Sequence, residues 1–280
     1  MFEEVALEDR LGGDRRVAVK FGAPWCSMCG HLEREVLATA EGRAIFDGLE
    51  TVGADFDAAP ALARRFAILD LPTVVVLAPD GAEVGRVVGY EAPRAWIAAA
   101  RAAVASDDPI PGLRAAAASG APRAMRALGE ALLSRAPDEG VAWLERASWG
   151  PDDDDASIEA LWVLGRYYHR VRGEPAIARF VWQALEARAP GAGHEALFWY
   201  AKAQAELGRP EVGSRAFEVA AARAARPAPV LADWARFAGR NGYEPARAVI
   251  RAACEAALPS ARGADRDQIE ELIMNLGRPL

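Results

Sequence analysis

Strand-like and helix-like segments alternate in the first part of this chain, and the strand-like segments then stop. Short apolar runs that are typical of strands predict four of them, at residues 17–21, 51–56, 71–77 and 83–88. From about residue 110 every segment has the apolar spacing of a helix. The change predicts an α/β domain over residues 1–107 and an all-helical domain over residues 108–280. The polar, proline-rich stretch 106–112 is the predicted linker.

The connections between the predicted strands indicate the type of sheet. One amphipathic helix is predicted from Cys29 to about Leu49 and a shorter one over residues 60–66. The last two strands are separated only by the turn Pro79-Asp80-Gly81 and form a hairpin, which a helix over residues 93–105 would cover. We therefore expect an open mixed sheet with helices on its faces.

The composition and charge exclude several classes of protein. The chain is 52% hydrophobic and 26% charged, which is typical of a globular protein with a sizeable core. The net charge is -7 and the arginines are scattered among acidic residues, so we expect no nucleic-acid partner. The apolar runs are too short for a transmembrane helix, and we expect no membrane association. The acidic N-terminus does not look like a signal peptide, so a cytoplasmic location is expected, with the periplasm as the alternative if a signal peptide was removed.

Three cysteines carry the most specific chemical information. Cys26 and Cys29 have Cys-x-x-Cys spacing, and Cys254 stands alone far downstream. Three cysteines are too few for a disulfide scaffold, and a second pair for a four-ligand zinc site is missing. A redox-active pair is therefore the leading interpretation, while Cys254 is expected to pack in a helical core.

The sequence around the first two cysteines is Ala23-Pro24-Trp25-Cys26-Ser27-Met28-Cys29, between a predicted strand and a predicted helix. It resembles the active-site turn of the thioredoxin family. Leu71-Pro72-Thr73 and Val88-Gly89-Tyr90 follow in the order and at about the distances seen in thioredoxins, and the resemblance covers about 100 residues. It implies a thioredoxin-like fold, with Pro72 in the cis form against the cysteines.

The resemblance also implies a role for each site residue. Only a thiolate attacks a disulfide, and a helix N-terminus favours the thiolate. Cys26 is therefore the expected nucleophile, and Cys29, one helical turn further on and more buried, is expected to resolve the mixed disulfide. Four residues are expected to shield the site or to bind an extended client segment: Trp25, Leu71, Pro72 and Gly89. No cofactor is expected beyond the Cys26–Cys29 disulfide, and no metal.

Two departures from familiar thioredoxins limit what the resemblance implies. Ser27-Met28 stands between the cysteines in place of Gly-Pro, so the direction of the reaction, reduction or oxidation, stays open. Lys20 occupies the strand position that is commonly a buried aspartate. Three roles are open for it: a charged partner of the thiolates, a neutral base for Cys29, or a side chain that reaches solvent at the strand end.

Glycines divide the helical region at regular intervals. Gly173, Gly208 and Gly242 are 35 and 34 residues apart, which is the period of a helical-hairpin repeat. The region resembles degenerate tetratricopeptide repeats through first-helix residues such as Tyr200 and second-helix residues such as Phe217. It is expected to form a short curved solenoid that recruits a protein or peptide, and residues 265–275 would form a terminal capping helix.

These features favour a protein-disulfide oxidoreductase whose repeats recruit a client with a disulfide or thiol and which exchanges electrons with an upstream thiol reductant or oxidant. The main alternative is a redox-sensing scaffold or co-chaperone in which the cysteine pair is not turned over. A metal-handling module that uses Cys26, Cys29 and His31 is a third interpretation, although a solvated His31 is the simpler expectation. Likewise, Asp152–Asp155 are expected to cap a helix rather than to bind a cation.

Overall fold

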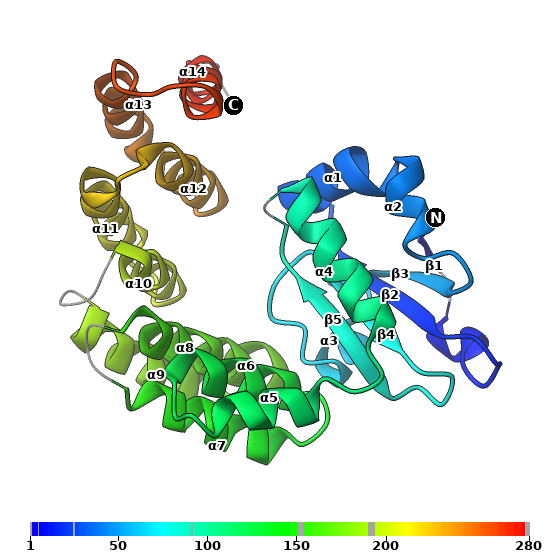
Figure 1. Cartoon of the computed structure of the whole chain (residues 1–280). Coiled ribbons are helices and arrows are strands. Elements are labelled where there is room, and N and C mark those ends of the chain that lie inside the picture. The colour runs from blue at the N-terminus through cyan, green and yellow to red at the C-terminus, as the bar shows by residue number, and fades with distance from the viewer. Residues whose placement is uncertain are drawn as a thin grey trace. The chain divides into compact units, whose positions relative to one another are not determined.

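The computed structural model describes the chain apart from residues 1, 5, 25, 91, 151–153, 190–193 and 278–280. The chain divides into two compact units (Figure 1). One comprises residues 1–143 with 166–173, and the other comprises residues 144–165 with 174–280. Because compactness does not test whether residues 1–107 fold on their own, the domain boundary at residue 107 stays a prediction.

The first unit is built on a mixed five-stranded sheet. Its strands in spatial order are β1 (Glu3–Glu4), β3 (Glu50–Asp55), β2 (Val17–Gly22), β4 (Thr73–Leu77) and β5 (Glu83–Val88). The central strand β2 pairs parallel with β3 and antiparallel with β4, and β5 completes the predicted hairpin with β4. Every residue of β4 is buried, which explains its continuous apolar sequence.

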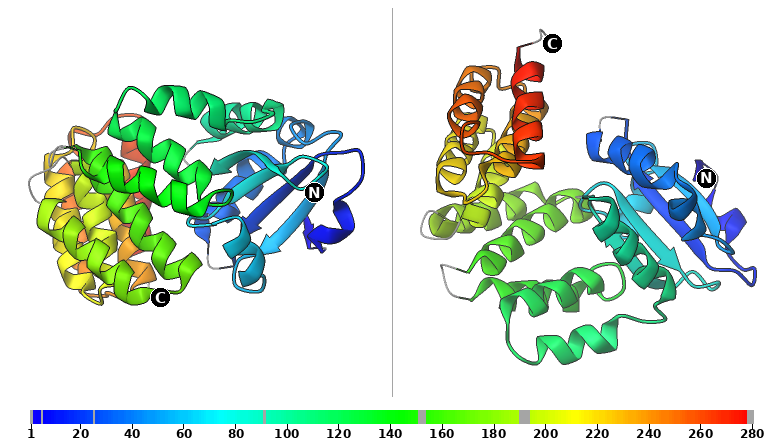
Figure 2. Two further views of the ribbon diagram at one scale, coloured as in Figure 1. Left: turned by 90° about the horizontal axis from the view of Figure 1, so that it is seen from below. Right: turned by 45° about the horizontal axis from the view of Figure 1, so that its top comes forward.

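Helices cover both faces of this sheet (Figures 1 and 2). On one face lie α1 (Ser27–Leu32), the π-helical turn η2 (Glu33–Leu37), α2 (Ala40–Ala44) and α4 (Pro93–Ala105), whose apolar side chains share a core with Val74 and Val76. On the other face, the 3₁₀ turn η1 (Leu7–Arg10) and α3 (Pro60–Arg65) pack on Val75 and Leu77. The predicted α/β fold, with a mixed sheet between helices, is confirmed.

The single helix predicted from Cys29 to Leu49 is wrong, because the segment is broken at Thr39. The Thr39 hydroxyl donates to the Val36 carbonyl at 2.7 Å and accepts the Gly42 N–H at 3.0 Å, so it ends one helical segment and caps the next. The break brings the backbone of Gly42 so close that a Cβ there would lie 2.0 Å from the Val36 oxygen. Apolar spacing alone gives no sign of this close approach.

The first unit continues beyond the sheet into α5 (Ile110–Ala117), α6 (Pro122–Leu132) and the first part of α7 (Pro137–Ser148). A buried polar cluster joins β5 to the end of α6. Glu83 accepts two hydrogen bonds from Arg86, at 2.7 and 2.8 Å, and one from the Ser134 hydroxyl at 2.8 Å. The π-helical turn η3 (Tyr167–Arg172) also belongs to this unit and packs against α3.

The second unit consists of helices that pack on their neighbours in sequence. They are α8 (Asp155–Arg166), α9 (Pro175–Arg188), α10 (His194–Glu206), α11 (Pro210–Arg223), α12 (Pro227–Arg240), α13 (Ala246–Ala257) and α14 (Ala264–Leu276). Gly208 and Gly242 lie at the α10–α11 and α12–α13 turns with φ of 80° and 58°, which glycine adopts without strain. The prediction of helices alone after residue 110 is confirmed for the described residues.

Aromatic side chains fill the core of the second unit, as their spacing predicts. Trp162, Trp182 and Trp234 are buried, and the Trp162 and Trp182 rings stack with centroids 5.8 Å apart. Cys254 is fully buried beside Ile250 and Ile269, so its predicted place in the core is confirmed.

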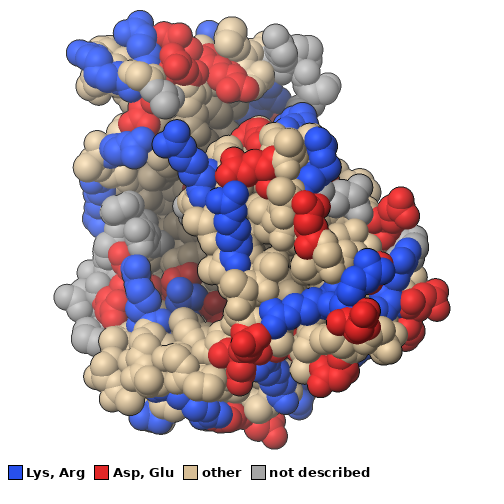
Figure 3. Space-filling model, turned by 45° about the vertical axis from the view of Figure 1, so that its right-hand side comes forward, with Lys and Arg blue, Asp and Glu red and all other residues tan. Residues whose placement is uncertain are grey.

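Charged side chains of both signs lie among uncharged ones on the surface. On the face shown in Figure 3, basic and acidic side chains lie next to one another, consistent with the scattered arginines of the sequence. Among the described helices, none is both long and apolar enough to cross a bilayer. Of the predicted capping aspartates, Asp152 and Asp153 lie outside the described residues, while Asp154 accepts the Ala156 N–H at 2.9 Å at the start of α8.

Candidate functional site

The two cysteines lie where β2 gives way to α1. The strand ends at Gly22, and the Cys26 N–H donates to the Ala23 carbonyl at 3.0 Å in the tight turn that follows. Cys26 is the N-cap of α1, and its Sγ accepts the Cys29 N–H at 3.2 Å. A backbone N–H that donates to sulfur stabilises a thiolate on Cys26, because the unpaired N–H groups of a helix start favour negative charge.

Cys26 and Cys29 form a disulfide, with their Cα atoms 5.3 Å apart. Cys26 is 4% exposed and Cys29 is 7% exposed. The expectation that Cys29 is the more buried of the two is therefore wrong for the disulfide form. The reason is local: Cys26 folds its sulfur back over the first turn of α1, where the disulfide holds it.

Pro72 lies at the same end of the sheet as the disulfide. Phe21 is the last residue of β2 paired with β4, opposite Thr73, so the next residues, Gly22 and Pro72, face each other across the two strands. The Leu71–Pro72 peptide bond is cis, as predicted. The Pro72 carbonyl accepts the Gly89 N–H at 2.7 Å, which ties Gly89 to this edge. Trp25 lies outside the described residues.

Lys20 has a partner that none of its three predicted roles included. Its amine forms an ion pair with Glu33 of η2, and its side chain is only 14% exposed, so it does not extend freely into solvent. Burial lowers the pKa of Lys20 below its usual value. Glu33 lies four residues after Cys29, so helical spacing from the cysteine could have identified it.

The Lys20 side chain approaches the cysteine pair through Gly22. A Cβ on Gly22 would lie 3.6 Å from the Cys29 sulfur and 3.9 Å from the Lys20 Cε atom. The Cys29 sulfur and the Lys20 side chain therefore lie on the same side of Gly22, at the end of β2. The Lys20–Glu33 ion pair thus lies near Cys29 at the end of β2.

A second polar group follows the cysteines on the exposed side of η2. The Tyr90 hydroxyl donates to Glu35 at 2.6 Å, and His31 Nδ1 lies 2.7 Å from the other Glu35 oxygen. The Tyr90 hydrogen bond, aided by His31, lowers the pKa of Glu35, and burial with the neighbouring carboxylate raises that of Tyr90. His31 is partly exposed on the helix surface, as expected. Among the described residues, no three His, Cys, Asp or Glu side chains are gathered as a metal site requires.

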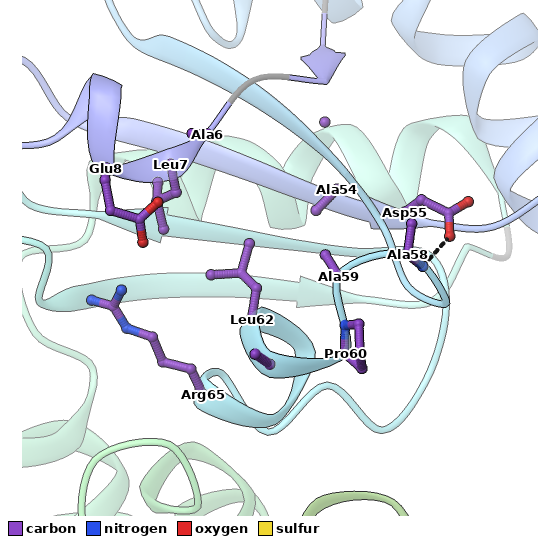
Figure 4. A pocket seen from close by; sticks show the side chains of 12 residues that line it. Ala6, Leu7, Glu8, Ala54, Asp55, Ala58, Ala59, Pro60, Leu62 and Arg65 are labelled. Carbon is purple, nitrogen blue, oxygen red and sulfur yellow. Dashed lines mark hydrogen bonds between the residues drawn. The ribbon is translucent and has the colours of Figure 1, made fainter.

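An open pocket of about 590 Å³ lies on the opposite face of the sheet from α1 (Figure 4). It is lined mainly by alanine and leucine side chains of η1, β3 and α3, with Glu8, Asp55 and Arg65 as its charged residues. Asp55 is occupied in holding the loop after β3, because its carboxylate accepts the Ala58 N–H at 2.9 Å. No sequence motif predicts a site here, and the predicted residues lie elsewhere.

Comparisons with known proteins agree on one family. A family model described as a thioredoxin-like domain matches residues 4–103. A thioredoxin of Mycolicibacterium smegmatis is 36% identical over 83 residues, which are 29% of this chain and 71% of that protein. A thioredoxin of Echinococcus granulosus is 31% identical over 86 residues, 30% of this chain and 75% of the relative. Thioredoxin H2 of Arabidopsis thaliana is 31% identical over 88 residues, 31% of this chain and 59% of that protein.

Proposed function

Because the chain belongs to the thioredoxin-like family through residues 4–103, we propose that it is a thiol-disulfide oxidoreductase that acts on protein clients through Cys26 and Cys29. The observation that carries the proposal is the Cys26–Cys29 disulfide at the start of α1, on the same sheet edge as the cis Pro72. The helical region would bring the client to this edge, and an upstream thiol reductant or oxidant would reset the pair.

In the reducing direction, the Cys26 thiolate attacks one sulfur of a client disulfide. A bond forms between Cys26 and that sulfur, and the other client sulfur leaves as a thiolate and takes up a proton. The Cys29 thiolate then attacks the Cys26 sulfur, which breaks the mixed disulfide and releases the second client thiol. The client has gained two electrons, and the protein is left with the Cys26–Cys29 disulfide. An external dithiol must then reduce the pair, and the oxidising direction is this sequence reversed.

The client segment would pair with the backbone that precedes β4. Pro72 faces Gly22 at the end of the sheet that leads to the cysteines, and the Gly89 N–H donates to the Pro72 carbonyl. Backbone that continues beyond the end of a strand, as residues 71–72 do, can bind an extended chain through main-chain hydrogen bonds, which depend little on the side chains of the client. Trp25 is assigned a shielding role by the family resemblance alone.

Lys20 and Glu33 would handle the proton of Cys29. Cys29 has to lose its proton before it can attack, and an amine whose pKa is lowered by burial can accept it. Glu33 is half-exposed and paired with this amine, which gives the proton a path to water. If Lys20 instead stays charged next to the thiolates, it favours the reduced pair and makes the protein more oxidising.

The helical region is proposed to recruit the client, and its likeness to tetratricopeptide repeats is part of this proposal. Support comes from the packing of each helix from α10 to α14 on the next one in sequence, which is compatible with stacked helical-hairpin repeats. Ile177 and Phe180 on α9 expose apolar side chains that a partner would cover. Slower trapping of protein clients by Ile177→Ser and Phe180→Ser, with an unchanged rate on a small disulfide, would support recruitment.

The low exposure of Cys26 and Cys29 favours one other candidate function. A disulfide buried in this way reacts slowly, as suits a redox-sensing scaffold whose pair changes state once and is not turned over. Turnover separates the two functions. The oxidoreductase reduces many equivalents of a disulfide protein such as insulin with a dithiol as the electron source, and Cys26→Ser abolishes this activity. The sensor is oxidised by one equivalent and then stops.

One further measurement determines whether the protein reduces or oxidises its clients. The Cys26–Cys29 reduction potential is obtained by equilibrating the full chain in buffers of reduced and oxidised glutathione. A value near that of thioredoxin, about -270 mV, assigns a reductant, and a value closer to -120 mV assigns an oxidant.

A further inference from the structure

The chain segment that precedes Pro72 is held by side chains on both sides. Downstream, the Thr73 hydroxyl donates to the Asp70 carbonyl at 2.7 Å. Upstream, Arg166 donates from Nη1 to the Asp70 carboxylate at 2.8 Å and from Nη2 to the Leu69 carbonyl. Residues 69 and 70 are therefore fixed immediately before the edge on which a client would pair.

Arg166 is well suited to hold this segment rigidly. It belongs to the first compact unit together with residues 167–173, and its side chain is only 8% exposed. Charge-assisted hydrogen bonds from a guanidinium are stronger than neutral ones, and its planar fork holds two acceptors in a fixed geometry. A buried arginine that donates one hydrogen bond to a backbone carbonyl fixes the position of the main chain as well as that of the Asp70 side chain.

A second contact joins the same short segment to the loop after β3. The Arg170 guanidinium lies 5.6 Å from the centre of the Phe56 ring, within the range of a cation–π interaction. The Phe56 N–H donates to the Gly22 carbonyl at 2.8 Å, at the end of β2 that leads to the cysteines. Residues 166–173 thus contact two of the loops that surround the disulfide edge.

Both arginines lie outside residues 4–103, the part of the chain that matches the thioredoxin-like model. The contacts are therefore additions to the family domain, contributed by a segment more than 90 residues away in the sequence.

We propose that Arg166 is a positioning residue for client recognition: it fixes Leu69 and Asp70 so that the Leu71–Pro72 edge is presented to an extended client segment. The inference rests on the proposed function. It predicts a difference between two kinds of substrate. The main chain that flanks a protein disulfide can pair with the Leu71–Pro72 segment, whereas a small disulfide has no such chain. Loss of Arg166 should slow the first kind of substrate and spare the second.

The test compares two disulfide substrates with the full-length protein. Insulin serves as the protein disulfide and 5,5′-dithiobis(2-nitrobenzoate) as the small one, with Arg166→Ala, Arg166→Lys and Asp70→Asn as variants. Arg188→Ala is the matched control, because Arg188 also donates to two backbone carbonyls, those of Ser148 and Gly150, within the second unit. Amide hydrogen exchange over residues 69–73 is measured on the same proteins, since it reports on the segment independently of catalysis.

For Arg166→Ala we expect kcat/KM on insulin to fall about tenfold, mainly through KM, because displacement of a binding edge weakens productive docking. The rate on the small disulfide should stay within about twofold, and exchange over residues 69–73 should be faster. Arg166→Lys keeps the Asp70 ion pair and should lose less, Asp70→Asn should show the same substrate selectivity, and Arg188→Ala should change neither rate.

Several results would overturn the inference. Equal losses on both substrates would mean a general effect on the cysteines, and faster exchange with unchanged insulin kinetics would mean a purely structural contact. If Arg166→Ala does not fold, Arg166→Lys and Asp70→Asn decide by the same criterion. If the wild type reduces neither substrate, the proposed function itself fails. A wild type active on both, with no selective loss in the variants, leaves the oxidoreductase standing and removes only the role of Arg166.

Discussion

Cysteine has opposite chemistry in the two compact units. In the first unit, Cys26 and Cys29 lie at a helix start where an N–H donates to sulfur, and they form a disulfide. In the second unit, Cys254 is fully buried among apolar side chains, and burial raises the pKa of its thiol to about 11. The residue type is the same in both units, so the comparison shows that the position of a cysteine relative to backbone donors determines its reactivity.

The units also differ in how they use buried polar groups. In the first unit, Lys20 and Arg166 lie beside the disulfide edge and the loop before Pro72. In the second unit, the Trp234 indole N–H donates to the Ser214 hydroxyl at 2.8 Å. Trp234 belongs to the apolar core there, so this hydrogen bond stabilises the packing of helices. Substitutions of Lys20 and Arg166 should therefore change activity, and substitutions of the Trp234–Ser214 pair should change stability alone.

The largest expected effect separates the two kinds of cysteine. Cys29→Ser should trap mixed disulfides with clients, because Cys26 can still attack but the intermediate cannot be resolved. Cys26→Ser should trap none and lose all turnover. Non-reducing gels and mass spectrometry of the trapped species provide the measurement.

Cys254 is the internal control for that experiment. Cys254→Ala should leave trapping and turnover unchanged, and iodoacetamide at neutral pH should label reduced Cys26 before Cys254, because the buried thiol is almost fully protonated. Equal trapping by Cys26→Ser and Cys29→Ser would mean that the nucleophile is misassigned.

The next effect concerns glycine in a helix of each unit. Gly42→Ala in α2 should lower the free energy of unfolding by about 3 kcal/mol, because the new Cβ would overlap the Val36 carbonyl. Gly239→Ala in α12 meets nothing within 4 Å and should raise it by about 0.5 to 1 kcal/mol through helix propensity. Urea unfolding of the full chain measures both, and equal effects would contradict the close approach at Gly42.

A smaller effect tests the polar pair inside the second unit. Trp234→Phe should lower the free energy of unfolding by about 1 to 3 kcal/mol, because the Ser214 hydroxyl is left buried without its donor. Ser214→Ala and the double variant complete a thermodynamic cycle that isolates the hydrogen bond. None of the three variants should alter disulfide turnover. A change in turnover would contradict the expectation that the Trp234–Ser214 pair affects stability alone.

The smallest effect is a pH dependence in the first unit. The pKa of Glu35 is lowered mainly by the Tyr90 hydrogen bond, so the carboxylate adds stability above its unfolded value of 4.5 and loses it as the pH falls through the lower folded pKa. Tyr90→Phe should reduce the stability of the protein at pH 7, and the difference from wild type should narrow below pH 4.5. Unfolding curves at pH 3.5 and pH 7 provide the check, and a difference that grew on acidification would contradict the assignment.

The sequence by itself determined the features that depend on short-range spacing. A separation of three positions between Cys26 and Cys29 places both sulfurs on one helical turn, so the pairing needed no knowledge of the fold. Apolar runs identified the strands, because burial imposes that pattern directly on the chain. Gly208 and Gly242 marked the α10–α11 and α12–α13 turns, because both positions have a positive φ.

Only the tertiary structure decided which distant side chains meet. Helical spacing places Glu33 one turn after Cys29, but no local pattern pairs Glu33 with Lys20, 13 residues away, or Arg166 with Asp70, 96 residues away. The break at Thr39 depends on a hydroxyl that bonds the backbone on both sides, which apolar periodicity does not record. The physical reason is common to all three: a polar side chain can choose among many partners, and the packing of the apolar core determines which one lies within reach.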